Sequence, residues 1–145
     1  MPSRSARTTW TGGLQDGTGT VELVSSGIAS YEVSFPRRVA DEAGGVTSPE
    51  ELLAAALSAC FAMQFSALLG DAGGSGQSLD VGAQATVGRD PAGGLRITGV
   101  KLTVRGSADG IGAEQFAEIV QQAKAACPVS KALGGTDITL DVASG

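Results

Sequence analysis

The chain has 145 residues, of which 42% are hydrophobic and 17% charged, a composition typical of a globular protein with one core. Its net charge of −5 argues against nucleic acid as a partner, because phosphate binding needs a basic surface. It has no histidine, which excludes a Ser-His-Asp triad, a Cys-His dyad and an imidazole metal site.

The N-terminal third predicts an antiparallel meander. Alternating β-forming residues fill three stretches, 8–14, 18–25 and 30–35. Pro36 lacks a backbone N–H and should end the third strand. Residues 36–47, rich in charge and glycine, are therefore expected to form a loop.

A helix start is indicated by Ser48 as N-cap, Pro49 at the first helical position and Glu51 in the place of a capping-box glutamate. The helix should run to about Leu69, before a glycine-rich loop over 70–78. Its apolar stretch contains Ser and Gln and is marginal in length for a membrane span, so we interpret it as a buried core helix. The N-terminus has no apolar run typical of a secretory signal, and the chain is expected to be cytoplasmic, where thiols stay reduced.

The C-terminal half predicts two strands, two helices and a last strand. The elements fall at about 79–87, 95–104, 113–126, 129–133 and 138–142. The alternation slips by one at Thr98-Gly99, which indicates a β-bulge, and residues 106–112 are expected to form a loop. The order β-β-β-α-β-β-α-β predicts a single α+β domain over 1–145, with helices packed on largely antiparallel sheet.

The two cysteines are the candidates for chemistry. Cys60 shares a helical stripe with Leu52, Ala56, Met63 and Ala67, and it could be an inert buried residue, since reactivity needs a nearby cation and access. Cys127 also lies on an apolar helix face. If a new helix starts at Pro128, Cys127 becomes its N-cap, where the helix dipole favours a thiolate.

Arg37 and Arg38 are the nearest cations in the sequence, either as a solvated pair or as a guanidinium that lowers a thiol pKa. Glu50 could orient that arginine, or act only on its own helix dipole. Ten helical residues separate Glu50 from Cys60 by about 15 Å. An antiparallel copy of the helix would bring Glu50 of one chain near Cys60 of the other, which predicts an isologous dimer with sites at its interface.

Two segments carry a family resemblance. Residues 47–63, TSPEELLAAALSACFAM, resemble the first-cysteine helix of the OsmC/Ohr family (osmotically inducible protein C and organic hydroperoxide resistance proteins). Residues 123–133, AKAACPVSKAL, resemble its second-cysteine motif. Trp10-x-Gly12 and the last strand extend the match over nearly the whole chain. The Ser-Lys-Ala-Leu ending and the arginine after Phe35 are more similar to the OsmC branch, in which Arg38 fits the register better than Arg37.

The resemblance implies an intertwined α+β homodimer that reduces organic (alkyl or fatty) hydroperoxides under oxidative or osmotic stress. Cys60 would attack the peroxide and become a sulfenic acid, and Cys127 would condense with it to a disulfide. Arg38 would activate Cys60, and Glu50 would hold Arg38. A dithiol, of lipoyl type in this family, would be the reductant. No metal, cofactor, nucleic acid or membrane partner is expected.

Two other functions fit the residues. A non-catalytic dimer could bind an apolar ligand beside Cys60, in which case peroxide would not consume the thiols. A one-shot thiol redox sensor would oxidise once per site without turnover. Metal binding is a weak third possibility because the chain lacks histidine.

Overall fold

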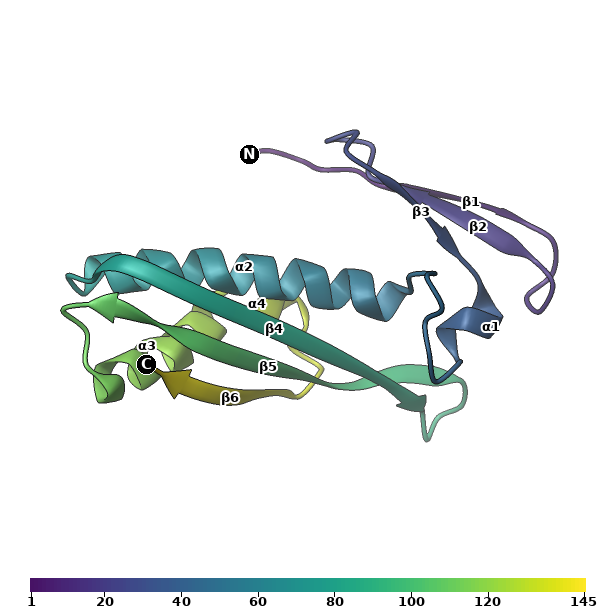
Figure 1. The fold of residues 1–145 in the computed structure, drawn as a ribbon. Helices are drawn as coiled ribbons and strands as arrows, with labels where there is room; N and C mark the ends of the chain where they lie inside the picture. Colours follow the sequence, from purple (N-terminus) through teal and green to yellow (C-terminus); the bar gives the residue numbers. More distant parts are fainter. The chain divides into compact units, whose positions relative to one another are not determined.

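The computed structural model describes residues 1–145 as two compact units, Met1–Leu52 and Leu53–Gly145 (Figure 1). The elements are β1 (Arg7–Thr11), β2 (Thr18–Glu22), β3 (Ser30–Val33), α1 (Phe35–Arg38), α2 (Pro49–Asp71), β4 (Ser75–Arg89), β5 (Leu95–Asp109), α3 (Ala113–Ala126), α4 (Pro128–Ala132) and β6 (Ile138–Ser144). The α+β class and the predicted order of strands and long helices are confirmed. That both units belong to one domain stays a prediction.

The first unit is the predicted meander, with β2 between β1 and β3 and both pairings antiparallel. The loop expected from residue 36 is wrong at its start, because Phe35–Arg38 forms the short helix α1. Pro36 lies in the first turn of this helix, where its missing N–H is not needed and its fixed φ suits the helix. Arg38 therefore occupies a helical position and not a flexible loop.

Helix α2 begins as predicted, and the Glu51 N–H donates a hydrogen bond to Ser48 Oγ at 3.2 Å. The expected core stripe through Met63 is wrong, because Met63 is 69% exposed. The fully buried row is Leu57, Phe61, Phe65 and Leu69, spaced by four residues. This helix is apolar all round, so periodicity did not decide which of its faces would pack.

By length and composition alone, α2 is the one helix that could cross a membrane, and 22% of that apolar stretch is buried. The interpretation as a core helix is therefore correct for one face only. Phe61 and Phe65 pack in the core of the second unit. The opposite side, which includes Ala55, Ala59, Met63 and Ala67, is an exposed apolar face.

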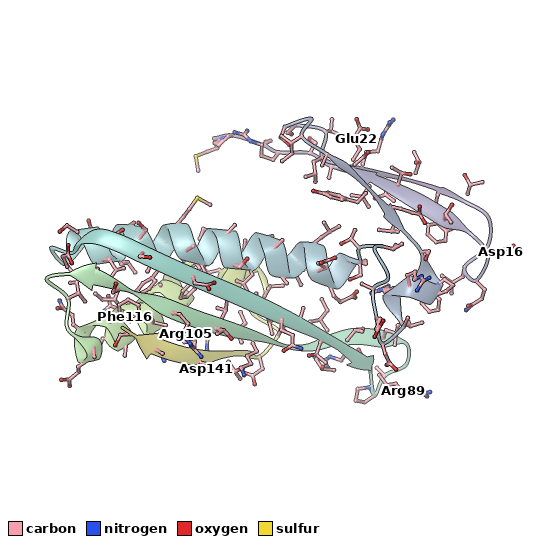
Figure 2. All side chains as sticks on the ribbon, viewed as in Figure 1. Asp16, Glu22, Arg89, Arg105, Phe116 and Asp141 are labelled. Carbon is pink, nitrogen blue, oxygen red and sulfur yellow. The ribbon has the colours of Figure 1, made fainter.

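The second unit contains one sheet in the order β4-β5-β6 (Figure 1). β4 and β5 pair antiparallel, and the predicted bulge is confirmed because Thr86 pairs with Gly99 and Val87 with Ile97, which leaves Thr98 unpaired. β6 runs parallel to β5. Arg105 and Asp141, labelled in Figure 2, tie these two strands together through an ion pair at 3.2 Å.

The loops expected over 70–78 and 106–112 are shorter than predicted, because β4 starts at Ser75 and β5 ends at Asp109. The backbone pairing between β4 and β5 continues beyond the last residues of the alternating apolar pattern, as far as Ser75 and Asp109. Gly106 makes this possible, since its φ is +157° and a Cβ there would collide with the Ser78 carbonyl oxygen.

The core of the second unit brings α2, α3 and the sheet together. Phe65 is at its centre, with its ring centroid 5.8 Å from that of Phe61 and 5.0 Å from that of Phe116, the latter pair close to perpendicular. Phe116 is labelled in Figure 2. This core fixes α2, which carries Cys60, against α3, which ends just before Cys127.

Truncating Phe65 to alanine should lower the free energy of unfolding by about 3–5 kcal/mol, because the site is fully buried and cannot collapse around the lost ring. Denaturant unfolding measures the change. Ile28→Ala is the control, since Ile28 is 76% exposed and its loss should cost less than about 0.5 kcal/mol. Similar losses in both variants would contradict the assigned core.

Candidate functional site

The two cysteine sulfurs lie side by side in the second unit. Cys60 Sγ and Cys127 Sγ are 3.2 Å apart, although 67 positions separate them in the chain. Both are free thiols, Cys127 fully buried and Cys60 partly exposed. A disulfide bond is about 2.05 Å long, so closing this pair needs a movement of only about 1 Å.

Local sequence places Cys127 at the junction of two helices. Its N–H donates to Ala123 O at 2.9 Å, which ends α3, and its carbonyl accepts from Lys131 N–H at 3.0 Å, which begins α4. Pro128 cannot continue α3 but suits the start of α4. The prediction that Cys127 caps a new helix is confirmed.

The surroundings of the two thiols differ. Burial raises the pKa of Cys60; the Val129 N–H partly opposes this, whereas the neighbouring Cys127 raises the pKa further. Burial also acts to raise the pKa of Cys127, but groups that can donate to its thiolate outweigh burial and lower that pKa: the Ser130 N–H, the Cys60 thiol, the Ser130 hydroxyl and the Val129 N–H. Cys127 is thus surrounded by more hydrogen-bond donors for a thiolate than Cys60 is.

Arg38 and Glu50 form a second pair, in the first unit. Arg38 Nε donates to both carboxylate oxygens of Glu50 at 3.1 and 3.2 Å, and Nη2 donates to Oε1 at 2.7 Å. The Glu50 residue is only 7% exposed. The arginine that Glu50 holds is therefore Arg38, the one that the register favoured over Arg37.

The charge on Glu50 depends on this contact. Burial acts to raise its pKa, but hydrogen bonds from Arg38, its own backbone N–H, the positive charge of Arg38 and a hydrogen bond from Ser48 outweigh burial and lower the pKa. The ionised carboxylate is thus the stable form in the fold.

Glu50→Gln should lower the free energy of unfolding by about 1–3 kcal/mol at pH 7, the usual value of a charged hydrogen-bonded contact. Because the pKa of Glu50 is lowered on folding, this stabilisation is fully present above its ordinary pKa of 4.5 and disappears as the pH falls through the folded value. Denaturant unfolding of both proteins at a series of pH values measures the difference. The control is Glu42→Gln, an exposed residue in the loop before α2, which should cost less than about 0.5 kcal/mol. A difference that stays constant down to pH 3 would contradict the assignment.

The four predicted residues thus form two pairs, one in each unit. Cys60 lies with Cys127, and Arg38 lies with Glu50. Ten residues of α2 separate Glu50 from Cys60, which is about 15 Å along a helix axis. The sequence analysis did not identify Ser130 as a neighbour of Cys127. Its position three residues after Cys127, at the start of a short helix, was the signal that could have indicated this contact.

A small apolar pocket lies beside Arg38 in the first unit. Its volume is about 140 Å³, and its lining consists of Trp10, Leu14, Val33, Ser34, Phe35, Arg38 and Pro49. Trp10 was noted only as part of the family match, and Leu14 was missed.

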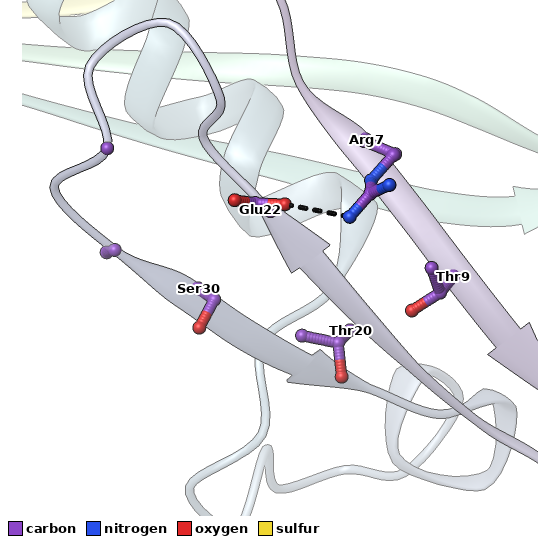
Figure 3. Close-up of a pocket in the computed structure, with 7 residues that line it drawn as sticks. Arg7, Thr9, Thr20, Glu22 and Ser30 are labelled. Atoms are coloured by element: carbon purple, nitrogen blue, oxygen red, sulfur yellow. Dashed lines mark hydrogen bonds and ion pairs between the residues drawn. The ribbon is translucent and has the colours of Figure 1, made fainter.

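Another hollow, of about 390 Å³, lies on the meander (Figure 3). Arg7 and Glu22 form an ion pair at 3.3 Å in its lining, and the other lining residues are Thr9, Thr20, Gly27, Ala29 and Ser30. No cysteine lines this hollow, so we do not assign it to the redox site. No group of three or more Cys, Asp or Glu side chains in the chain could hold a metal ion.

An α+β chain with two free thiols in contact is a candidate dithiol redox protein. The family model for OsmC-like protein matches residues 42–142, and the chain belongs to this family. The peroxiredoxin OsmC of Escherichia coli (strain K12) is 40% identical over 132 residues, which cover 91% of this chain and 90% of that protein. The organic hydroperoxide resistance protein OhrA of Bacillus subtilis (strain 168) is 36% identical over 100 residues, 67% of each protein.

Solved structures share the fold. An organic hydroperoxide resistance protein from Elizabethkingia anophelis superposes with a TM-score of 0.74 at 25% identity, covering 100% of this chain and 98% of that chain. An OsmC-like protein from Vibrio cholerae reaches a TM-score of 0.75 at 21% identity, covering 99% and 100% of the two chains. The family resemblance and the fold class that the sequence predicted are confirmed.

Proposed function

We propose that this protein is a thiol peroxidase that reduces organic hydroperoxides to alcohols in the cytoplasm. The observation that carries the proposal is the contact of Cys60 and Cys127 at 3.2 Å. Relatives named peroxiredoxin and organic hydroperoxide resistance protein support a peroxidase-type function. A pair so close can pass from dithiol to disulfide without rearranging the fold.

The proposed reaction has three steps. The Cys60 thiolate attacks the distal peroxide oxygen, the O–O bond breaks, and the alkoxide takes a proton and leaves as the alcohol. Cys60 is then a sulfenic acid, and Cys127 attacks its sulfur and releases water as the disulfide forms. A dithiol, for which we propose a lipoyl-type carrier, reduces the disulfide by thiol exchange and is itself oxidised.

Cys60 needs a cation for the first step, because burial and its neighbour raise the pKa of its thiol. Arg38 is the proposed cation. Glu50 holds its guanidinium by three hydrogen bonds, which leaves part of the arginine side chain, 32% exposed, for another contact. A fixed guanidinium stabilises both the thiolate and the negative charge that develops on the peroxide oxygen.

The proposed enzyme is a homodimer in which the Arg38–Glu50 pair of one chain acts on Cys60 of the other. The exposed apolar face of α2 supports this, since Met63 at its centre is 69% exposed and such faces mark interaction surfaces. The length of α2 supports it too, because one helix separates Glu50 from Cys60 by about 15 Å. A second copy related by a two-fold axis would cover the face and join the two pairs.

The pocket beside Arg38 is the proposed site for the organic group of the substrate. Leu14→Ala should lower kcat/KM for cumene hydroperoxide by about three- to tenfold, because apolar contact is lost. Leu14 is 59% exposed, so the fold should persist. Hydrogen peroxide has no organic group, and its reduction should be unchanged. Equal losses for both peroxides would contradict this assignment.

The proposed function is tested by peroxide consumption with cumene hydroperoxide and excess dithiothreitol. The native protein should turn over many times, and the double variant Cys60→Ser/Cys127→Ser not at all. One oxidation per chain without turnover would favour the redox sensor. Thiols that stay reduced in excess peroxide would favour a dimer that binds an apolar ligand.

A further inference from the structure

The two sulfurs of the proposed disulfide differ in access to a reductant. Cys127 is fully buried at the junction of α3 and α4, whereas Cys60 on α2 is partly exposed. Thiol exchange requires the incoming sulfur to approach the sulfur that it attacks from outside. Only the Cys60 side of the pair offers that approach in this chain.

The two sulfurs also differ in what stabilises a negative charge. Ser130 lies three residues after Cys127 in α4, and its hydroxyl oxygen is buried without a hydrogen-bond partner in the reduced protein. A buried hydroxyl without a partner is uncommon and needs an explanation. A hydroxyl hydrogen rotates freely, so it can turn to a sulfur that has become a thiolate.

We propose that the reductant attacks Cys60 Sγ, that Cys127 is the leaving sulfur, and that Ser130 is a positioning residue that stabilises the departing Cys127 thiolate. The inference rests on the proposed function, since it describes how the same dithiol pair is restored. It names Ser130 as a further residue of the site and fixes the order in which bonds change.

The exchange balances as follows. A thiolate of the reductant forms a disulfide with Cys60, the Cys60–Cys127 bond breaks, and its electron pair stays on Cys127. The second thiol of the reductant loses its proton and attacks the reductant sulfur that is bonded to Cys60. Cys60 is released as a thiolate, and the reductant leaves as a cyclic disulfide. Two electrons pass to the protein, and the two cysteine thiolates become thiols by taking up protons equivalent to those that the reductant released.

The groups around Cys127 also favour attack on Cys60, with Cys127 as the leaving sulfur. A disulfide is cleaved faster when the departing thiol has the lower pKa. The pKa of Cys127 is lowered, because the backbone N–H of Ser130 and the other donors around this sulfur outweigh burial. The exposure of Cys60 and the stabilisation of a Cys127 thiolate therefore both favour attack on Cys60 Sγ.

The test begins with native protein oxidised by diamide, which closes the disulfide without any peroxidase activity. Oxidised protein is mixed with 2-mercaptoethanol, quenched in acid after short times, and mapped by peptide mass spectrometry. The adduct should lie on Cys60, with a free thiol at Cys127, in at least about tenfold excess over the reverse. An adduct mainly on Cys127, or failure of diamide to join the two cysteines, would overturn the inference.

Ser130→Ala tests the role of the hydroxyl. The oxidised variant should react with dithiothreitol about three- to tenfold more slowly than native protein, because the departing thiolate loses a donor. In the reduced variant, the thiolate absorbance should appear at higher pH, a shift that a merely structural role would not produce. The control is Ser58→Ala, whose hydroxyl instead donates to the Ala55 carbonyl. Unchanged reduction and titration in Ser130→Ala would overturn this role.

These outcomes separate the inference from the proposed function. A Cys60 adduct in a protein that never turns over peroxide would contradict the peroxidase and leave the direction of exchange standing. Full turnover of peroxide with the adduct on Cys127 would contradict the direction of exchange and leave the peroxidase function standing.

Discussion

Cys60→Ser is expected to reduce cumene hydroperoxide turnover to the uncatalysed rate, a loss of about 10⁴-fold or more. A serine hydroxyl at this position has no base to activate it, and removing the nucleophile of a covalent mechanism removes nearly all of the catalysis. Turnover with dithiothreitol measures the loss. Residual activity within tenfold of native protein would contradict the assignment of Cys60 as the attacking sulfur.

Cys127→Ser is the matched variant, because it keeps the first step and removes the second. Without reductant it should consume one equivalent of peroxide per chain and leave a sulfenic acid that dimedone labels. Native protein should consume the same equivalent and form a disulfide that dimedone does not label. A labelled sulfenic acid at Cys127 in the Cys60→Ser variant would reverse the two roles.

Arg38→Ala is expected to lower kcat/KM by about 10²–10³-fold, the usual cost of removing a preorganised group that stabilises developing charge. Arg37→Ala should stay within about twofold of native protein, because Glu50 holds Arg38 and not its neighbour. The pH at which Cys60 becomes a thiolate should rise in Arg38→Ala. Equal losses in the two arginine variants would point to a general effect of surface charge.

Mixed dimers decide which chain supplies the arginine. Arg38→Ala and Cys60→Ser chains with different tags are co-expressed, and the heterodimer is purified through both tags. If Arg38 acts on the partner's thiol, one site of the heterodimer has both native residues, and about half of the native activity returns. If Arg38 acts within its own chain, neither site is complete, and the heterodimer stays as inactive as its parents.

Local patterns predicted the elements of this fold well. Ser48 and Pro49 placed the start of α2, and the slip in alternation at Thr98 placed the bulge. These features depend on neighbouring residues alone, since capping and strand alternation are local. The rule that proline ends a strand did not predict α1, because Pro36 also suits the first turn of a helix.

Local sequence patterns did not predict which face of α2 is buried. Apolar residues cover all sides of this helix, and periodicity therefore gave no preferred face. The aromatic row through Phe61 and Phe65 is buried because rings from α2 and α3 fill the space above the sheet. Met63, expected in the core, is exposed as a result.

Residue types and their spacing along the chain were enough to predict the α+β class, the family and the four candidate side chains. Which of these residues lie in contact became clear from the three-dimensional packing. It placed Cys127 against Cys60 at 3.2 Å, and Arg38 rather than Arg37 on Glu50. Such contacts depend on how helices pack and where short helices turn, which long-range burial and steric fit decide and local sequence patterns do not contain.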